Sequence, residues 1–526
     1  MKCAALAFAL GVLLVSGCSG GFSGRSAAST GILRVALEHS VVTYDPGRVQ
    51  DPEAIEMLGN IYDPLVGYNE HNEIEPRLAE SYEATDGGRV WTFHLRKGVK
   101  FHNGREMTAG DVKWTLERNL RKSFASPVAF NYLSGILGAK ELSEGTADSL
   151  KGVEVVDDST VKITLIEPRA YFLGQITYPC AFVLAKEAAG DQEITDLKQM
   201  IGTGPFKVDK ILPDQLVSLT ANADYFLGKP KLSKIEQPLV IDPVTRLNMY
   251  KKGQLDILAV DRASLAGVKA DKSLVDQLQT RPQPTVFYIG LNQHLYKPFQ
   301  SLKVRQAFAM AIDRKHIAED LLGGVPEAHG LITPEVPGYR PNFQGVPYNP
   351  KDARMLLEEA GYPNGKGLPE LEILYIESGP DSRTVVQGVQ ESLKKNTNWP
   401  VTLRALQPSV FFDKRNASKL PCWYLTWGAD YPDPQNFTTF LLRSDSTMDY
   451  EGYRNAEFDR VGKLADTTLD KDKRLKLYQD AEDILMYDVA RVPLNFQIDN
   501  ILVSPKVKDL RMNLMGNLPH VLTDVK

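Results

Sequence analysis

Residues Leu425–Phe437 read Leu-Thr-Trp-Gly-Ala-Asp-Tyr-Pro-Asp-Pro-Gln-Asn-Phe, and the rest of the chain is interpreted outward from this stretch. Its acid, Asp430, stands between Trp427 and Tyr431, and the two prolines that follow exclude a continuing helix. A carboxylate walled by aromatic rings is poorly hydrated, so a cation that enters the site compensates its charge best. Gly428 leaves the backbone open to close approach by a ligand. The alternative interpretation is an Asp-Pro turn with aromatic packing.

The length and composition describe a multidomain globular protein. A chain of 526 residues is too long for one hydrophobic core, so two or three domains are expected. Hydrophobic residues make up 43% and charged residues 24%, which is ordinary for a soluble protein. The formal net charge of -5 and the lack of a basic run argue against nucleic acid as a partner. Beyond the N-terminus, no apolar run reaches the roughly 18–20 residues that span a bilayer.

The N-terminus predicts export and lipidation. Lys2 precedes the apolar run Ala4–Val15, which has the length of a signal-peptide core. The run ends in small residues before Cys18 and resembles a bacterial lipobox, so residues 1–17 are predicted to be a signal peptide and Cys18 a lipidation site. Residues 18–30 are rich in Gly, Ser and Ala and read as a flexible tether. The alternative is a secretion signal with a chance cysteine.

The mature chain would keep two further cysteines, Cys180 and Cys422. They lie far apart in sequence, and two lone cysteines in a large exported protein are more often buried thiols than a disulfide. We therefore expect no bridge between them.

Hydrophobic periodicity mixes strands and helices throughout, without a repeat of fixed period, which indicates the α/β class. Strands are predicted at Ile32–Leu37, Val90–Leu95, Gln254–Leu258, Val286–Asn292, Leu371–Ile376, Val401–Leu406 and Val492–Ile498, with a hairpin over Val153–Leu165. Helices are predicted from Ala109 after a Thr108 cap, from Ser301 to Gly323-Gly324, from Asn349-Pro350, and from about Lys473.

Eight segments, in order along residues 32–495, carry a family resemblance. They are Pro76–Tyr82, Trp91–Gly104, Thr108–Val112, Gly202–Phe206, Asn222–Pro230, Val304–Arg314, Ala353–Pro363 and Trp427–Pro434. Together they resemble the family 5 extracellular solute-binding proteins, the peptide- and nickel-type receptors of ABC importers.

The resemblance implies a periplasmic-binding-protein-like fold of two lobes that close over a ligand. Lobe I would take residues 31–285 and 496–526, with an additional subdomain inserted, and lobe II residues 286–495. The chain would cross between lobes near Pro284 and Leu494, which would make these the two hinge strands.

The resemblance also implies the site. In peptide-binding relatives, the aspartate of the Trp-x-x-Asp motif pairs with the α-ammonium of the ligand, and here that residue is Asp430. Main-chain groups would pair with the peptide as an added strand. The residues expected to contribute them from lobe II are Thr426, Trp427 and Gly428, with Tyr431 beside them, and from lobe I Val49, Gln50 and Asp51.

The partner of the ligand's carboxylate is left open. Some relatives carry an arginine shortly before the Trp-x-x-Asp motif, but Tyr424 stands at that position. Arg415 matches another ligand-side arginine, and Arg383 is a further candidate. The preferred peptide length depends on this assignment.

The predicted function is therefore a lipid-anchored, extracytoplasmic, monomeric binding protein. It would deliver short peptides to the permease and ATPase subunits of an importer, with no cofactor and no resident metal. The alternatives are a nickel chelate, an oligosaccharide or other small solute, and a peptide-signal receptor. A hydrolase has little support, because the only Gly-x-Ser-x-Gly, Gly17–Gly21, lies in the lipobox. The eight histidines form no metal-binding pair, and His94 and His102 are the closest.

Overall fold

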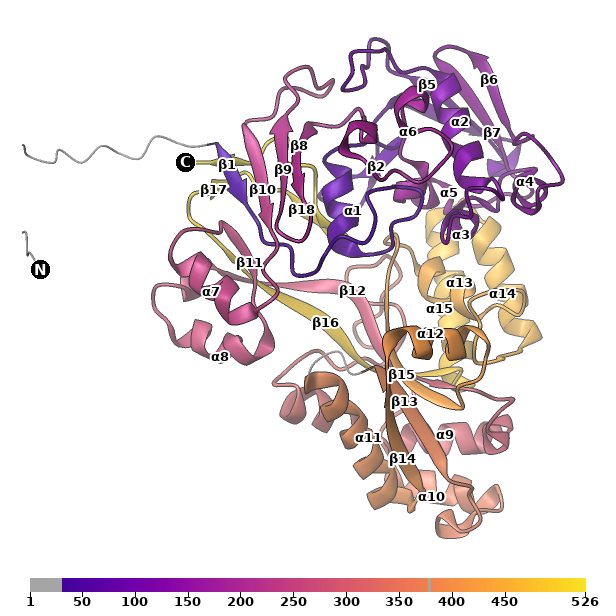
Figure 1. The fold of residues 1–526 in the computed structure, drawn as a ribbon. Helices are drawn as coiled ribbons and strands as arrows, with labels where there is room; N and C mark the ends of the chain where they lie inside the picture. Colours follow the sequence, from indigo (N-terminus) through magenta and orange to yellow (C-terminus); the bar gives the residue numbers. More distant parts are fainter. Residues whose placement is uncertain (1–30, 377–379) are drawn as a thin grey trace, which may run out of the picture.

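The computed structural model describes residues 31–376 and 380–526, which form two α/β lobes joined by long strands (Figure 1). The predicted signal peptide, Cys18 and the tether lie outside the described residues. Among the described residues, no helix combines the length and the apolar character that a membrane crossing requires.

The N-terminal lobe contains a four-stranded sheet of order β1-β10-β9-β8, in which β1 runs parallel to β10 and the other pairs are antiparallel. Helix α1 packs beside it and begins after Asp51, whose side chain accepts a hydrogen bond from the Ala54 backbone N–H. The bounds are β1 Ile32–Arg34, α1 Pro52–Gly59, β8 Phe206–Leu212, β9 Leu216–Ala221 and β10 Lys234–Pro238. Helices α7 (Pro243–Lys251) and α8 (Arg262–Ala270) follow.

A second antiparallel sheet, of order β4-β5-β7-β6, packs against helix α2 (Ala109–Leu120). Its strands are β4 Ala79–Thr85, β5 Val90–Leu95, β6 Val153–Asp157 and β7 Thr160–Thr164. The predicted strand Val90–Leu95 is confirmed, and its alternate residues from Trp91 to Leu95 are buried. The predicted hairpin and the Thr108 cap of α2 are confirmed as well. Short helices α3 (Ala129–Leu133) and α5 (Phe172–Gln175) complete this part.

The C-terminal lobe contains most of a six-stranded mixed sheet of order β11-β16-β12-β15-β13-β14. The strands are β11 Ile257–Ala259, β12 Leu278–Leu291, β13 Leu371–Ile376, β14 Val401–Leu406, β15 Cys422–Gly428 and β16 Arg491–Val503. The helices around it are α9 Leu302–Ala311, α10 Pro350–Glu359, α11 Pro380–Thr397, α12 Pro408–Asn416, α14 Ala456–Thr467 and α15 Lys471–Tyr487.

Strands β12 and β16 connect the two lobes (Figure 1). They pair antiparallel from Leu278 opposite Leu502 to Gly290 opposite Arg491. The expected crossing points, Pro284 and Leu494, lie inside these strands, and the register shifts between Pro282 and Val286. A break in a ladder lets a strand pair bend. The residue limits assigned to the lobes from sequence stay a prediction.

One predicted helix is interrupted. The helix expected from Ser301 to Gly323-Gly324 ends at Ala311, where Ile312 turns to an extended conformation. A separate π-helical segment, His316–Leu321, follows. The carboxylate of Asp313 accepts a hydrogen bond from the His316 backbone N–H at 3.0 Å, so it caps the new segment and favours the break.

Cys180 and Cys422 are buried free thiols, as expected from sequence. Burial raises the pKa of both, because the thiolate would lose its hydration.

Candidate ligand-binding cleft

A cavity of about 430 Å³ lies where both lobes meet the connecting strands. Its walls come from α1, from strand β12, from the end of β15 and from residues 513–519 near the C-terminus. Most of the lining is apolar or aromatic, which suits an organic ligand with a few fixed polar contacts. The lining includes Ile55, Tyr62, Pro64, Tyr68, Tyr178, Pro179, Phe182, Pro284, Leu514, Met515, Leu518 and Pro519.

Asp430 is half-buried in this wall, just beyond the end of β15. The Asn436 side chain holds it from both sides, donating from Nδ2 to Oδ2 at 3.3 Å and accepting from the Asp430 backbone N–H at 3.1 Å. The Tyr132 phenol lies close enough to the carboxylate to lower its pKa. Desolvation outweighs these donors and raises the pKa of Asp430 to about 6. Its hydrogen-bond donors are neutral, so a cationic group of a ligand would find an uncompensated charge.

Two tyrosines link Asp430 to the opposite lobe. The rings of Tyr132 and Tyr178 stack with centroids 3.9 Å apart and planes 13° apart. The Tyr178 hydroxyl donates a hydrogen bond to the carbonyl of Val49 at 3.1 Å. The structure thus brings together Asp430 and Val49, which are far apart in sequence, through a pair that sequence reasoning missed. No local pattern distinguishes these two tyrosines from ordinary core aromatics.

The aromatic neighbours of Asp430 in sequence face elsewhere. The Trp427 indole is half-buried and donates to the Asn436 side chain at 3.1 Å, so it helps to fix the amide that holds Asp430. Tyr431 is fully buried, and its hydroxyl donates to Gln435 at 2.6 Å. Neither ring lines the cavity, and their roles as ligand contacts stay predictions.

Thr426 and Gly428 are exposed residues at the end of strand β15, and Gly428 lines the cavity. On one side β15 pairs with β12 along its whole length, from Cys422 opposite Leu291 to Gly428 opposite Thr285. On the other side, within the described residues, the register with β13 stops at Trp423. An edge without a partner strand can accept an extended peptide.

The three predicted lobe I residues differ in their placement. Gln50 lines the cavity, and Val49 is fully buried behind it. Asp51 is committed to capping α1, with its Oδ1 2.8 Å from the Ala54 backbone N. A ligand would therefore meet the side chain of Gln50 before those of its neighbours.

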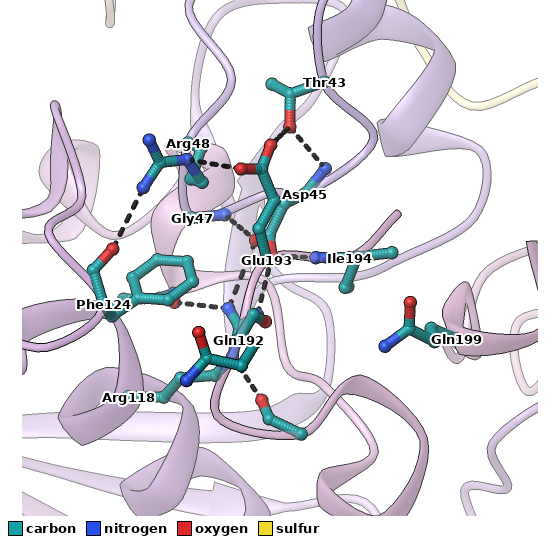
Figure 2. A network of polar contacts seen from close by, with 12 residues as sticks. Thr43, Asp45, Gly47, Arg48, Arg118, Phe124, Gln192, Glu193, Ile194 and Gln199 are labelled. Carbon is teal, nitrogen blue, oxygen red and sulfur yellow. Dashed lines mark hydrogen bonds and ion pairs between the residues drawn. The ribbon is translucent and has the colours of Figure 1, made fainter. Parts of the chain in front are cut away.

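A buried ion pair anchors the loop that carries these residues (Figure 2). The carboxylate of Asp45 receives Nη2 of Arg118 at 2.6 Å and Nη1 at 3.2 Å, and both side chains are fully buried. Asp45 also accepts the backbone N–H groups of Gly47 and Ile194. The Arg118 guanidinium lies over the ring of Phe124 at 4.1 Å. These contacts join helix α2, the loop before α1 and residues 190–194.

The candidate carboxylate partners lie outside the cavity lining. Arg415 packs its guanidinium over the rings of Phe412 and Tyr450, at 4.9 and 4.4 Å. Arg383 is exposed near the start of α11, and Tyr424 is buried against Phe287. The residue that binds a ligand carboxylate stays a prediction.

A cleft between two lobes, walled largely by apolar groups and carrying a carboxylate with only neutral hydrogen-bond donors among the described residues, is typical of a solute-binding protein. No group of three or more potential metal ligands occurs among the described residues. The model of the bacterial extracellular solute-binding proteins, family 5, matches residues 73–449. The chain belongs to this family, which is one of binding proteins rather than enzymes, and the predicted two-lobed fold is confirmed.

Alignments with individual relatives cover most of the chain. Heme-binding protein A of Haemophilus influenzae is 32% identical, with 85% of this chain and 84% of that protein covered. The dipeptide-binding protein of Escherichia coli is 28% identical, with the same coverage of both. Among solved structures, the E. coli murein tripeptide binding protein MppA matches with a TM-score of 0.79 and 26% identity, over 94% of this chain and 98% of that one. Helicobacter pylori DppA in complex with the peptide STSA gives a TM-score of 0.77, with the same identity and coverage.

Proposed function

We propose that the protein captures short peptides with a free α-amino group between its lobes and delivers them to the permease and ATPase subunits of an ABC importer. The observation that carries the proposal is Asp430, a cavity-lining carboxylate that is half-buried and hydrogen-bonded only to neutral donors. Burying a carboxylate without a cation is costly, and an entering ammonium offsets that cost.

The rest of the cleft supports a peptide as the ligand. The free edge of β15 beyond Trp423 offers main-chain groups next to Asp430, and Gln50 faces the same space from α1's side. Main-chain pairing is indifferent to side-chain identity, so one site can take many sequences. The names of several relatives, among them the dipeptide-binding protein and DppA with its bound peptide, agree with this ligand class.

The test is calorimetric titration of the full chain, purified in detergent, with paired peptides. Ala-Ala-Ala should bind and its N-acetylated form should bind at least tenfold more weakly, because acetylation removes the ammonium. Asp430→Asn should remove most of this difference, whereas Asp148→Asn, an exposed acid outside the cavity lining, should preserve it. An equal loss for both peptides in Asp430→Asn would refute the role of Asp430.

Other ligands are included in the same titration. Hemin and deoxycholate are chosen because relatives carry those names, and a nickel chelate and an oligosaccharide represent the alternatives from sequence. Binding of one of these, with no binding of any peptide, would overturn the proposed ligand class. Mass spectrometry of ligand that copurifies with the protein gives an independent answer.

We also propose that the protein is held at the outer face of a membrane by lipid on Cys18, with residues 18–30 as the tether. The support is the apolar run and small residues before Cys18, together with the extracellular character of the family. Several acyl chains on one cysteine hold a protein at a membrane, since each buried methylene contributes about 0.8 kcal/mol. Cys18→Ser should release the protein from the membrane fraction, and retention of this variant there would refute the anchor.

A further inference from the structure

A second carboxylate lines the same cavity and shares the features of Asp430. Glu56 on α1 lies in the wall, half-buried, and its nearest donors come from Asn517. Asn517 donates from Nδ2 to Oε1 at 2.8 Å and from its backbone N to Oε2 at 3.4 Å. Both donors are neutral. Within the described part of the chain, no Lys, Arg or His nitrogen lies within 4.0 Å of the carboxylate of Glu56 or of Asp430.

The other charged groups of the lining compensate one another. Asp63 is 1% exposed and accepts hydrogen bonds from Thr203 and Tyr225, each at 2.9 Å. Arg77 lies close enough to lower the pKa of Asp63 and forms an ion pair with Glu75 at 3.0 Å. The lining thus holds three carboxyl groups and one guanidinium. Once Asp63 and Arg77 are set against each other, the lining holds no cation for Asp430 and Glu56. The charge of Arg281, which lies outside this lining, partly offsets the rise that burial causes in the pKa of Glu56, but Arg281 is shared with Asp499 and Glu335.

Next to Glu56 lies a hydrogen-bond acceptor without a donor, the side-chain oxygen of Asn517. The Oδ1 atom of Asn517 is buried and has no hydrogen-bond partner, while Nδ2 of the same amide is fixed by Glu56. A buried polar atom without a partner is costly, so a donor at this point would be stabilising. The carboxylate and the amide oxygen together favour a positively charged group that carries several N–H donors.

The position of Glu56 relative to β15 indicates which part of a ligand would reach it. Strand β12 runs from Thr285, opposite Gly428, through Gln283, and Gln283 lines the cavity together with Glu56. A peptide paired with β15 and anchored at Asp430 would extend its main chain towards Thr426. Glu56 and Asp430 line the same cavity, so we place the first side chain of a ligand that is held by its α-ammonium at Asp430 against Glu56.

We propose that Glu56 and Asn517 form a subsite for a cationic side chain, so that the preferred ligands are peptides whose first residue is lysine or arginine. The proposal rests on the proposed function, because it places the α-ammonium at Asp430. Such a ligand brings two positive charges to the two carboxylates of the lining that have no cation within 4.0 Å among the described residues. The apolar wall of Ile55 and Leu518 would surround the methylene groups of the side chain.

The test compares Lys-Ala-Ala with norleucine-Ala-Ala, which keeps the α-amino group and an apolar chain of nearly the same length but lacks the ε-ammonium. Calorimetry on the full chain should give roughly tenfold or more tighter binding of the lysine peptide. Glu56→Gln should bring the affinity ratio close to one. Asp148→Asn, an exposed acid outside the cavity lining, should leave the ratio as in the wild type.

The outcomes separate this inference from the proposed function. Equal or tighter binding of the norleucine peptide to the wild type, with both peptides bound, would overturn the subsite and leave the proposed function standing. An unchanged ratio in Glu56→Gln would also overturn it. If Glu56→Gln does not fold, Nε-acetyl-lysine-Ala-Ala on the wild type decides: binding as weak as that of norleucine supports the subsite, and binding equal to that of lysine refutes it. Failure of every peptide to bind would refute both proposals.

Discussion

The buried pair of Asp45 and Arg118 leads to a quantitative prediction about stability. Both side chains are fully buried, and the pair is bidentate at 2.6 and 3.2 Å (Figure 2). Arg118→Met removes the guanidinium and leaves the Asp45 carboxylate buried with two backbone donors. Breaking one side of a buried ion pair costs about 3–5 kcal/mol. We expect the free energy of unfolding of the N-terminal lobe to fall by about this amount.

The assay is urea denaturation followed by tryptophan fluorescence and circular dichroism. Arg121→Met is a matched control one helical turn further, at the C-cap of α2. Arg121 also forms an ion pair, with Nη1 2.9 Å from Oδ1 of Asp191, but the Arg121 side chain is 30% exposed. Exposed ion pairs contribute about 0–1 kcal/mol, so the control should unfold close to the wild type. The double variant Asp45→Asn/Arg118→Met should recover part of the loss, since it buries no unpaired charge. If Arg118→Met and Arg121→Met unfold at the same urea concentration, the reasoning is refuted.

Three further predictions concern the cleft and the connecting strands. With a pKa of about 6, Asp430 should make peptide affinity fall roughly tenfold between pH 8 and pH 5, and titrations of Asp430→Asn should lack this dependence. Because its folded pKa lies above the unfolded value, the same group should make the ligand-free protein more stable as the pH falls from about 6 to about 4, and a melting-temperature series with the Asn variant as control checks the sign. Gly290→Ala should lower stability by about 1–3 kcal/mol, because the new Cβ would lie 2.2 Å from the Trp423 ring, and a denaturation midpoint equal to the wild type would contradict it.

Much of the fold is encoded locally. The strands Val90–Leu95, Leu371–Ile376 and Val401–Leu406 were predicted with the bounds that the structure gives, because their hydrophobic period is strong and turn residues flank them. The helix after Asn349-Pro350 was predicted for the same kind of reason, a capping side chain followed by proline at the first helical position.

The interrupted helix after Ala311 shows where local reasoning failed. The apolar spacing continues across the break, so periodicity alone favours one helix. The competing signal was Asp313, whose side chain caps the segment that starts at His316. A capping residue inside an apolar pattern has two interpretations, and only the packing of the whole lobe selects between them.

The strand Cys422–Gly428 was missed for a different reason. Its sequence was interpreted through the Gly, Asp and Pro that follow, while its pairing with β12 joins residues more than 130 positions apart. Register between such distant segments is determined by tertiary packing and leaves little trace in the local pattern.

The residues of the candidate site also differ in whether the sequence predicts them. Of the residues that the family resemblance predicts, Asp430, Gly428 and Gln50 line the cavity, and their roles as ligand contacts stay predictions. Tyr132, Tyr178 and the segment 513–519 were not predicted, because they reach the cleft through contacts with segments far away in the sequence.

Glu56 illustrates the difference between a residue identified by a motif and a residue identified by the cavity that it lines. A motif identifies a residue that a family uses in common, such as the acid of Trp-x-x-Asp. A cavity is also lined by residues that are particular to this chain and part of no family motif. Their chemical role can be inferred only when the structure shows which groups they contact. In the sequence, Glu56 looks like an ordinary solvated acid on a helix surface. In the structure it lies beside the Asn517 amide and lines the same cavity as Asp430, and among the described residues no cation lies within 4.0 Å of it. The general amine anchor and the side-chain preference would then be separate properties of one cleft, and substitution at Glu56 would change the preference while leaving Asp430 to bind the amine.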